Sequence, residues 1–469
     1  MLKKRYPYYL ANHPVSAKQE LDVLDKYSGK RATRVALADA ATVRKAIVAA
    51  YKAREAMAAF PPDARRDVLE HCVRRFTERS EELAQALCIE AGKPIKDARG
   101  EVTRLIDTFR IAAGEATRSN GELLELQVSP RARGYRGMVK RVPIGACSFI
   151  TPFNFPLNLV AHKVAPAIAV GAPIVVKPAP ATPLTALLLG EILAETELPP
   201  GMFSILPLPN DRASALVADP RLPVVSFTGS APVGAQIRAA VPEKHVTLEL
   251  GGNAAVLICS DYRNLDWAAQ RVALFSNYQG GQSCIAVQRV FVHSSIADAF
   301  TEKLVEAVSK LDFDAQVGPL ISEQAAQRVQ QWVDESGGRV LAGGSRQGTR
   351  YEPTVLTDVA GDAKVVTEEV FGPVMVLSTV DSDDAGLDAV NDSKYGLQAG
   401  VFTTNVQTAF KAHTTLNVGG VIIGDAPSYR ADQMPYGGAK GSGVGREGLR
   451  SAMHDYTEAR VMVLTNLEL

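Results

Sequence analysis

The stretch "GAPIVVKPAPATPLTALLLGEILAET", residues 171–196, decides the fold. It joins a short apolar strand to an apolar helix through a loop rich in proline. Further strand-like runs stand at 144–150, 201–208 and 222–229, and a helix-like run follows at 230–241. Strands separated by helices form parallel sheets with helical crossovers. The region therefore predicts an α/β domain of the Rossmann-like, nucleotide-binding type.

The rest of the chain divides into helices, a second α/β block and two extended segments. Apolar residues three and four apart predict helices over 41–91. A second α/β block is expected over about 251–451. The segments 131–143 and 457–469 are extended and have no helix beside them. Such strands need a partner edge, which another subunit could supply.

The composition excludes several classes of protein. A chain of 469 residues predicts two or three domains, and 46% hydrophobic with 22% charged residues is typical of a globular protein. Because 51 basic residues balance 51 acidic ones, we expect neither a nucleic-acid partner nor an anionic membrane surface. The longest uncharged stretch, 142–161, is interrupted by prolines and asparagines, which excludes a membrane span.

The cysteines point to a reducing compartment. They form no CxxC pair, so we expect free thiols, a cytoplasmic location and no metal site. By spacing, four of the five belong to helical or strand cores. The cysteines are Cys72, Cys88, Cys147, Cys259 and Cys284.

Two glycine patterns resemble phosphate-binding motifs. "GVGREG" at 443–448 follows a loop rather than a strand, which argues against a dinucleotide fingerprint. "GSAPVGAQ" at 229–236 lacks the Lys-Ser/Thr of an ATP-binding loop. However, a strand runs directly into Gly229 and Ser230 and a helix follows, so free N–H groups could face a pyrophosphate. An ordinary strand-to-helix turn explains the pattern equally well.

Four polar residues stand where chemistry is possible. Cys284 follows two glycines in "QGGQSC", and Asn154 lies between aromatic and proline residues in "PFNFP". Taken alone, each has an ordinary explanation: packing for the thiol and turn formation for the amide. Glu249 ends the strand of "VTLELGG", and Glu369 precedes an aromatic turn in "TEEVFGPV". A solvated glutamate would give either pattern.

Seven motifs in order resolve these alternatives. "PFNFP", "VVKPAP", "FTGSAPVG", "LELGG", "GGQSC", "EEVFGPV" and "PYGGAKGSGVGREG" occur in the order and approximate spacing of the aldehyde dehydrogenase superfamily. The resemblance covers nearly the whole chain, and the last motif is similar to the lactaldehyde and succinic semialdehyde dehydrogenase branches. It implies a cofactor-binding domain over 1–124 and 144–250, a catalytic domain over 251–454, and oligomerisation strands over 125–143 and 455–469.

The resemblance also implies an activity and its catalytic residues. Cys284 matches the family's nucleophile, Asn154 its oxyanion-stabilising amide and Glu249 its general base. The implied reaction oxidises an aldehyde to a carboxylic acid with NAD(P)⁺ through a cysteine thiohemiacetal and a thioester. CoA-acylating relatives lack a glutamate at the position of Glu249. The alternatives are a CoA-acylating enzyme and a catalytically silent member.

NAD or NADP is the implied cofactor. Lys177 matches the residue that binds the adenosine ribose, Ser230 the pyrophosphate contact and Glu369 the residue that holds the nicotinamide ribose. The full set of cofactor residues implied by the resemblance is Ile150, Thr151, Pro152, Phe153, Lys177, Pro180, Gly229, Ser230, Val233, Leu250, Glu369 and Phe371.

Two departures from the family pattern bear on specificity. Pro180 replaces a glutamate that many NAD-preferring members carry, so we expect NADP to be tolerated or preferred. Ser283 stands where enzymes for phosphorylated trioses tend to have arginine. Positive charge could still come from Arg104, Arg289 or Arg430. The expected partner is a small aldehyde, bound near Phe153, Ser283, Ile285 and 426–434 of a homodimer or homotetramer.

Overall fold

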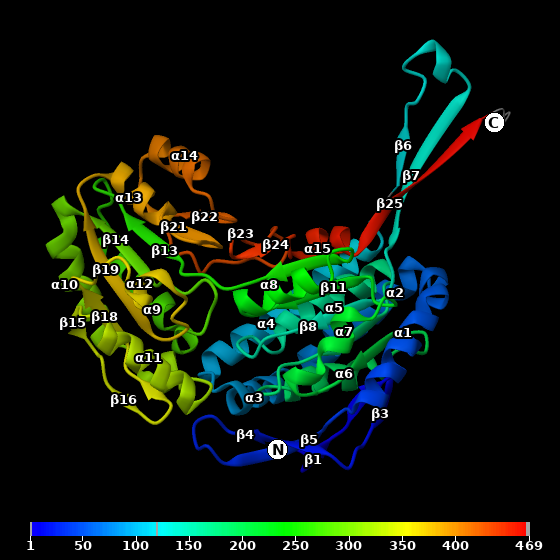
Figure 1. Cartoon of the computed structure of the whole chain (residues 1–469), viewed down its shortest axis with the longest axis horizontal. Helices are drawn as coiled ribbons and strands as arrows, with labels where there is room; N and C mark the ends of the chain where they lie inside the picture. Colours follow the sequence, from blue (N-terminus) through cyan, green and yellow to red (C-terminus); the bar gives the residue numbers. More distant parts are fainter. Residues whose placement is uncertain (1, 119–120, 466–469) are drawn as a thin grey trace.

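Two large sheets stand side by side, and a strand extension projects away from them (Figure 1). The computed structural model describes residues 2–118 and 121–465. The architecture is the α/β fold that the sequence predicts. In the predicted cofactor domain, residues 1, 119 and 120 lie outside the described residues.

The first large sheet comes mainly from the N-terminal half of the chain. Its central strands β12, β11, β8, β9 and β10 are parallel, and its outer strands pair antiparallel. In spatial order its strands are β24 (Gly443–Val444), β12 (His245–Glu249), β11 (Val224–Thr228), β8 (Cys147–Ile150), β9 (Ile174–Lys177), β10 (Phe203–Ile205), β2 (Tyr8–Leu10) and β3 (His13–Val15).

Helices cover both faces of this sheet. Strands β8 and β9 are buried along their whole length, which is the usual state of parallel strands between helical layers. The helices that pack here are α1 (Ala40–Ala59), α2 (Pro62–Glu78), α3 (Ser80–Ala91), α4 (Ile95–Ala116), α5 (Asn158–Val170), α6 (Leu184–Leu193), α7 (Ser214–Ala218), α8 (Ala231–Ala240) and α15 (Leu449–Asp455).

Helix α5 is buried on all sides and carries polar residues into the interior. Its sequence "NLVAHKVAPAIAV" is largely apolar, as expected for a fully buried helix. Asn158, His162 and Lys163 are the exceptions. Buried polar groups require partners, and Lys163 donates to the Ser226 hydroxyl at 2.7 Å.

The second large sheet forms the other half of the molecule. All its strand pairs are parallel except β15 with β18. In spatial order its strands are β15 (Arg339–Ala342), β18 (Thr354–Thr357), β19 (Val374–Val380), β14 (Arg289–His293), β13 (Ala255–Ile258), β21 (Gln398–Phe402) and β22 (Gly420–Ile423). Its helices are α9 (Leu265–Asn277), α10 (Ala297–Ser309), α11 (Glu323–Glu335), α12 (Lys364–Thr367), α13 (Asp383–Asn391) and α14 (Val406–Thr415).

The two extended segments pair with each other. Strand β25 (Thr457–Thr465) runs antiparallel to β7 (Tyr135–Pro143), from Thr457 opposite Pro143 to Thr465 opposite Tyr135, and β6 (Glu122–Leu124) pairs with the far edge of β7. Each segment thus has the partner edge that the sequence led us to expect, and the other segment of the same chain supplies it. The last four residues of the predicted 455–469 strand lie outside the described residues.

The N-terminal residues form strands that the sequence patterns did not indicate. A small sheet contains β1 (Arg5–Tyr6), β5 (Arg31–Ala36) and β4 (Glu20–Leu24). Two short pairs complete the strands: β16 (Arg346–Gln347) with β17 (Arg350–Tyr351), and β20 (Tyr395–Gly396) with β23 (Ala439–Lys440). Among the described residues, no helix has the length and apolar character needed to cross a membrane.

Candidate active site

A cavity of about 1160 Å³ contains every catalytic and cofactor residue predicted from the sequence. The first large sheet contributes the carboxyl ends of β8, β11 and β12, where α/β sheets usually bind ligands. The second half of the chain contributes Cys284, Glu369 and Phe371. Fifteen predicted residues from distant parts of the sequence thus face one space.

The second of the two glycines before the cysteine is required by the local backbone. A 3-10 turn, Tyr278–Gly281, leads into Cys284, and Gly281 has a φ of +68°. A Cβ atom at Gly281 would lie 2.1 Å from the carbonyl oxygen of Gly372. Glycine is therefore the residue that fits this close approach. The turn brings the loop that carries Cys284 against the segment that carries Glu369.

Cys284 lies in a largely apolar part of the cavity. Burial raises the pKa of its thiol to about 12, while a hydrogen bond with Tyr436 and the positive charge of Arg430 act to lower it. The Tyr436 hydroxyl is 3.1 Å from the sulfur. Because the thiolate is the reactive form, groups that favour the charged sulfur determine its reactivity.

Two hydrogen bonds hold Asn154 beside the loop that carries Cys284. Its side-chain amide donates to the carbonyl of Gln282 at 3.1 Å, and its backbone carbonyl accepts a hydrogen bond from the Gln279 amide. An amide has two N–H donors, so one remains for a ligand. The structure therefore brings a fixed amide donor next to the cysteine.

A buried ion pair supports this arrangement. The Lys93 ammonium is 2.5 Å from Glu101, donates to Gln279 at 2.5 Å and lies over the ring of Phe155. Burial lowers the pKa of Lys93, and the Glu101 carboxylate opposes this effect. Glu101 also accepts the backbone N–H groups of Leu157 and Asn158 at the start of α5, each at 3.0 Å.

Glu249 ends β12 as a buried carboxyl group. Neither of its side-chain oxygens has a hydrogen-bond partner within the described part of the chain. Burial raises its pKa well above the usual range, and the negative charge of Glu447 raises it further. Lys163 and Arg430 act in the opposite direction. An acid with a raised pKa facing a cavity has the property required of a general base near neutral pH.

A charged network borders the same end of the cavity. Glu447 contacts Lys163 at 2.7 Å and Arg430 at 3.1 Å, which holds the pKa of Glu447 well below its usual range despite burial. Asp432 joins His162 at 2.7 Å and Arg104 at 2.8 Å. The sequence named Arg104, Arg430 and the segment 426–434, which contains Asp432, but it did not indicate His162 or Lys163. Glu447 lies in the "PYGGAKGSGVGREG" motif, which was its only sequence signal.

Other residues that line the cavity have the features of a dinucleotide site. Lys177 donates to the side-chain oxygen of Asn210, and burial lowers the pKa of Lys177 to about 8. The Gly252 N–H donates to Glu369 at 3.0 Å, and burial raises the pKa of Glu369 to about 7. Ser230 occupies the N-cap position of α8, where free N–H groups suit a phosphate. These residues fit a bound NAD or NADP.

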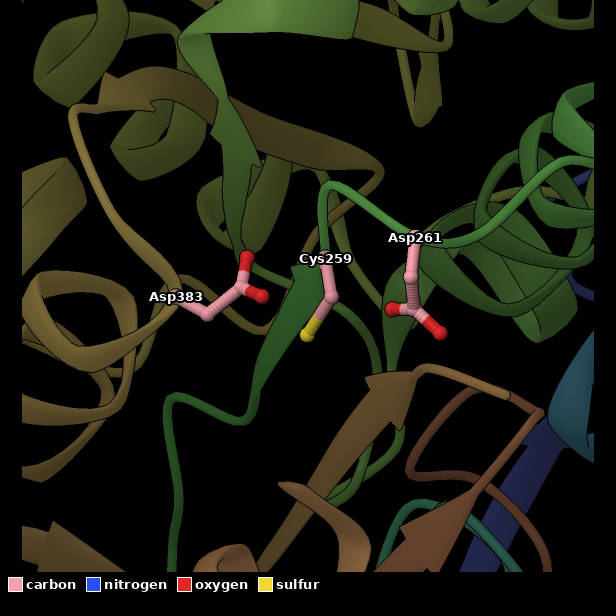
Figure 2. Close-up of side chains that lie close together, drawn as sticks. All are labelled: Cys259, Asp261 and Asp383. Carbon is pink, nitrogen blue, oxygen red and sulfur yellow. The ribbon is translucent and has the colours of Figure 1, made fainter. Parts of the chain in front are cut away.

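One further cluster has metal-ligand residue types but a different explanation. Cys259 lies between Asp261 and Asp383 (Figure 2), and one potential ligand atom from each falls within 4.8 Å of the others. Asp383 already accepts from the backbone N–H and hydroxyl of Ser260, while Asp261 accepts from Thr403 and Thr404. The carboxylates therefore tie loops together, and nothing else in the cluster points to an ion.

Comparison with known proteins gives a family for the whole chain. The model of the aldehyde dehydrogenase family matches residues 14–462. The chain belongs to this family. It is 40% identical to a 3-sulfolactaldehyde dehydrogenase of Priestia megaterium, over 98% of both chains.

Solved structures agree with this assignment. Aldehyde dehydrogenase 21 from Physcomitrella patens, in complex with the reaction product succinate, superposes with a TM-score of 0.97 at 47% identity, over 100% of this chain and 99% of that one. The glyceraldehyde-3-phosphate dehydrogenase GapN of Methanocaldococcus jannaschii, complexed with NADP, gives 0.90 at 34% identity, over 96% and 100%. The chain is therefore an NAD(P)-dependent aldehyde dehydrogenase.

Most of the substrate residues predicted for this aldehyde dehydrogenase line the cavity, with one correction. Phe153, Ser283 and Ile285 line it, as do Ser428, Tyr429 and Arg430 from the predicted 426–434 segment. Arg104 lines it as well, but Arg289 does not. Arg289 is buried and donates to the backbone carbonyls of Asn253, Ala389 and Val390, so it cannot supply charge to a substrate.

Replacing Gly281 with alanine tests how the backbone supports the loop that carries Cys284. Because a Cβ atom would meet the Gly372 carbonyl at 2.1 Å, Gly281→Ala should lower the free energy of unfolding by about 2 to 4 kcal/mol. The displaced loop should also lower kcat/KM at least tenfold. Chemical denaturation and steady-state kinetics measure both effects.

The matched control is Gly100→Ala, in the interior of α4. No atom lies within 4 Å of a Cβ at Gly100, so alanine should preserve activity and raise stability by about 0.5 to 1 kcal/mol. Equal behaviour of the two variants would contradict the close approach at Gly281.

Proposed function

We propose that this enzyme oxidises short aldehydes that carry an anionic group, using NAD⁺ or NADP⁺, and releases the free acid. The observation that carries the proposal is the joining of Cys284, Asn154 and Glu249 with Arg104 and Arg430 in one cavity. The first three residue types serve covalent aldehyde chemistry, and the arginines suit an anion.

Cys284 and Asn154 perform the first step. Cys284 bonds to the carbonyl carbon, and the carbonyl oxygen gains negative charge. The Asn154 amide stabilises that charge, a contribution of about 2.7 to 4 kcal/mol for one donor of this kind. When bound, the nicotinamide would supply the hydride acceptor that oxidation of the substrate carbon requires. Lys177, Ser230 and Glu369 would hold the dinucleotide.

Glu249 performs the second step. After oxidation Cys284 carries the acyl group as a thioester, and Glu249 accepts a proton from the water that attacks it. No group in the described structure donates a hydrogen bond to either side-chain oxygen of Glu249, so both keep the capacity to accept from that water. The presence of this carboxylate supports hydrolysis over transfer to CoA, and a requirement for CoA in turnover would reverse the choice.

Arg104 and Arg430 support an anionic substrate. Both line the cavity, and the Nε atom of each is buried without a hydrogen-bond partner among the described residues. Asp432 accepts a hydrogen bond from one terminal nitrogen of the Arg104 guanidinium, and the remaining N–H groups can donate to a substrate. Two similar proteins point the same way, since one is named for a sulfonated aldehyde and the other was solved with succinate.

The strand extension supports assembly of identical subunits. It projects from the body of the molecule (Figure 1) and exposes Leu123, Met138, Val461, Met462 and Val463. Exposed apolar side chains on an edge strand favour pairing with another chain. We propose that a second copy covers them in a homodimer or homotetramer. The cytoplasmic location stays a prediction.

Substituting Glu249 tests the second step. Glu249→Gln should give a burst of about one NAD(P)H per subunit, followed by a steady rate roughly 10² to 10⁴ times slower than wild type. In wild type the deacylation rate should increase as pH rises through the raised pKa of Glu249, because the base acts when deprotonated. The absorbance of NAD(P)H after rapid mixing measures the burst and the steady rate. A Cys284→Ala control should give no burst, and unchanged steady turnover of Glu249→Gln would refute the role.

Substituting Arg104 tests the anionic substrate. Arg104→Met should lower kcat/KM for succinic semialdehyde by roughly ten- to a hundredfold, since hydrogen bonds to charged groups contribute about 1.5 to 3 kcal/mol. Lactaldehyde, which is neutral, serves as the matched control substrate and should change by less than about threefold. An equal loss for both aldehydes would show that Arg104 supports the structure rather than the anion.

The cofactor preference follows from Pro180. With no carboxylate at this position, kcat/KM with NADP⁺ should lie within about a hundredfold of that with NAD⁺. Asp211 also lines the cavity close in sequence to Asn210, the partner of Lys177, and it was missed from sequence. Pro180→Glu should lower the NADP⁺ value at least tenfold and spare NAD⁺. In the wild type, a kcat/KM with NADP⁺ more than about a hundredfold lower than that with NAD⁺ would contradict the expectation.

A further inference from the structure

One side chain in the cavity touches the nucleophile and has no role in the mechanism above. The Tyr436 hydroxyl lies 3.1 Å from the sulfur of Cys284, within the range of a hydrogen bond to sulfur. Tyr436 is 3% exposed and packs with Ile285 and Leu397 around the cysteine. Burial of a phenol without a partner is costly, so the sulfur is the group that satisfies its hydroxyl.

The position of Tyr436 is set by its backbone. Tyr436 and Glu447 form an antiparallel bridge, in which the Tyr436 N–H donates to the Glu447 carbonyl at 2.9 Å and the reverse bond measures 2.6 Å. The side chain of the same glutamate contacts Lys163 and Arg430. The phenol is thus attached to the charged network rather than to a free loop.

Arg430 lies over the face of the Tyr436 ring. Its guanidinium carbon is 3.7 Å from the ring centroid, a distance typical of a cation–π contact. A positive charge on the ring face draws electron density from the phenol and strengthens its O–H as a donor. The nearby carboxyl groups of Glu369 and Glu249 oppose ionisation of the sulfur, because their negative charges raise the pKa of Cys284.

We propose that Tyr436 is a further catalytic residue, whose hydroxyl donates a hydrogen bond to the Cys284 thiolate and increases the population of reactive sulfur. The thiol proton leaves to solvent or to Glu249, and Tyr436 keeps its own proton. The step is a proton transfer without a change in the oxidation state of the sulfur. A thiolate has no proton to give, and the phenol is then the donor of the pair. When the sulfur bonds to the substrate carbon its charge moves to the carbonyl oxygen, and the hydrogen bond weakens.

The titration behaviour of the two groups is consistent with these roles. Burial raises the pKa of Tyr436 well above its usual value, so the phenol stays protonated at physiological pH. The hydrogen bond with Tyr436 lowers the pKa of Cys284 against the larger effect of burial. The ring alone would supply packing, whereas the hydroxyl acts on the sulfur.

The experiment measures the thiol directly and is independent of which aldehyde the enzyme oxidises. The rate of alkylation of Cys284 by iodoacetamide is followed by peptide mass spectrometry across neutral and alkaline pH, with neither aldehyde nor dinucleotide added. Tyr436→Phe should alkylate about tenfold more slowly at neutral pH, with the profile shifted by about one pH unit to higher pH. The alkaline plateau should match wild type.

The control variant is Tyr262→Phe. It also removes a phenol hydroxyl, but the ring of Tyr262 packs on Phe402 and does not line the cavity. Its alkylation profile should coincide with that of wild type, and thermal unfolding should confirm that both variants are folded. A Tyr436→Phe profile that also coincides with wild type would overturn the proposal. If the shift occurs but no anionic aldehyde is oxidised, the proposed substrate class fails while the role of Tyr436 stands.

Discussion

The buried ammonium of Lys93 connects the parts of the active site to the helical layer beneath them. It contacts Glu101 and Gln279, and Gln279 in turn donates to the backbone of Asn154. Glu101 also receives the first N–H groups of α5, the helix that carries His162 and Lys163. Removing one partner of a buried pair leaves an uncompensated charge, which typically costs about 3 to 5 kcal/mol. The Asn154 amide, the loop that carries Cys284 and helix α5 therefore depend on one interaction.

The charges around the cavity explain why two glutamates close to each other behave differently. Glu447 lies among Lys163, Arg430 and His162, and its pKa falls although it is buried. Glu249 has no side-chain partner in the described structure, and its pKa rises. The first carboxylate is a permanent counter-ion that orients its neighbours. The second is left free to exchange a proton, as two carboxyl groups in different environments commonly divide such roles.

Tyr436 and Arg430 connect this network to the sulfur. A thiol buried among apolar side chains resists ionisation, and the environment of Cys284 is largely apolar. A neutral phenol can favour the thiolate without adding a full charge to the substrate pocket. Arg430 contacts Glu447 and the Tyr436 ring, so the same guanidinium orients the phenol and faces the substrate space.

The sequence by itself determined the fold class and the family, and it named the candidate catalytic and cofactor residues. Alternating strands and helices have a short-range pattern, and motifs such as "GGQSC" and "LELGG" are local, so Cys284, Asn154, Glu249 and Lys177 could be found without coordinates. The tertiary structure decided the rest. Strand β25 pairs with β7 across more than three hundred residues, and Glu447 meets Lys163 at a separation of 284, because contacts of that range have no signature in a local pattern. Whether Arg289 faced a substrate or the backbone depended in the same way on which distant carbonyls surrounded it.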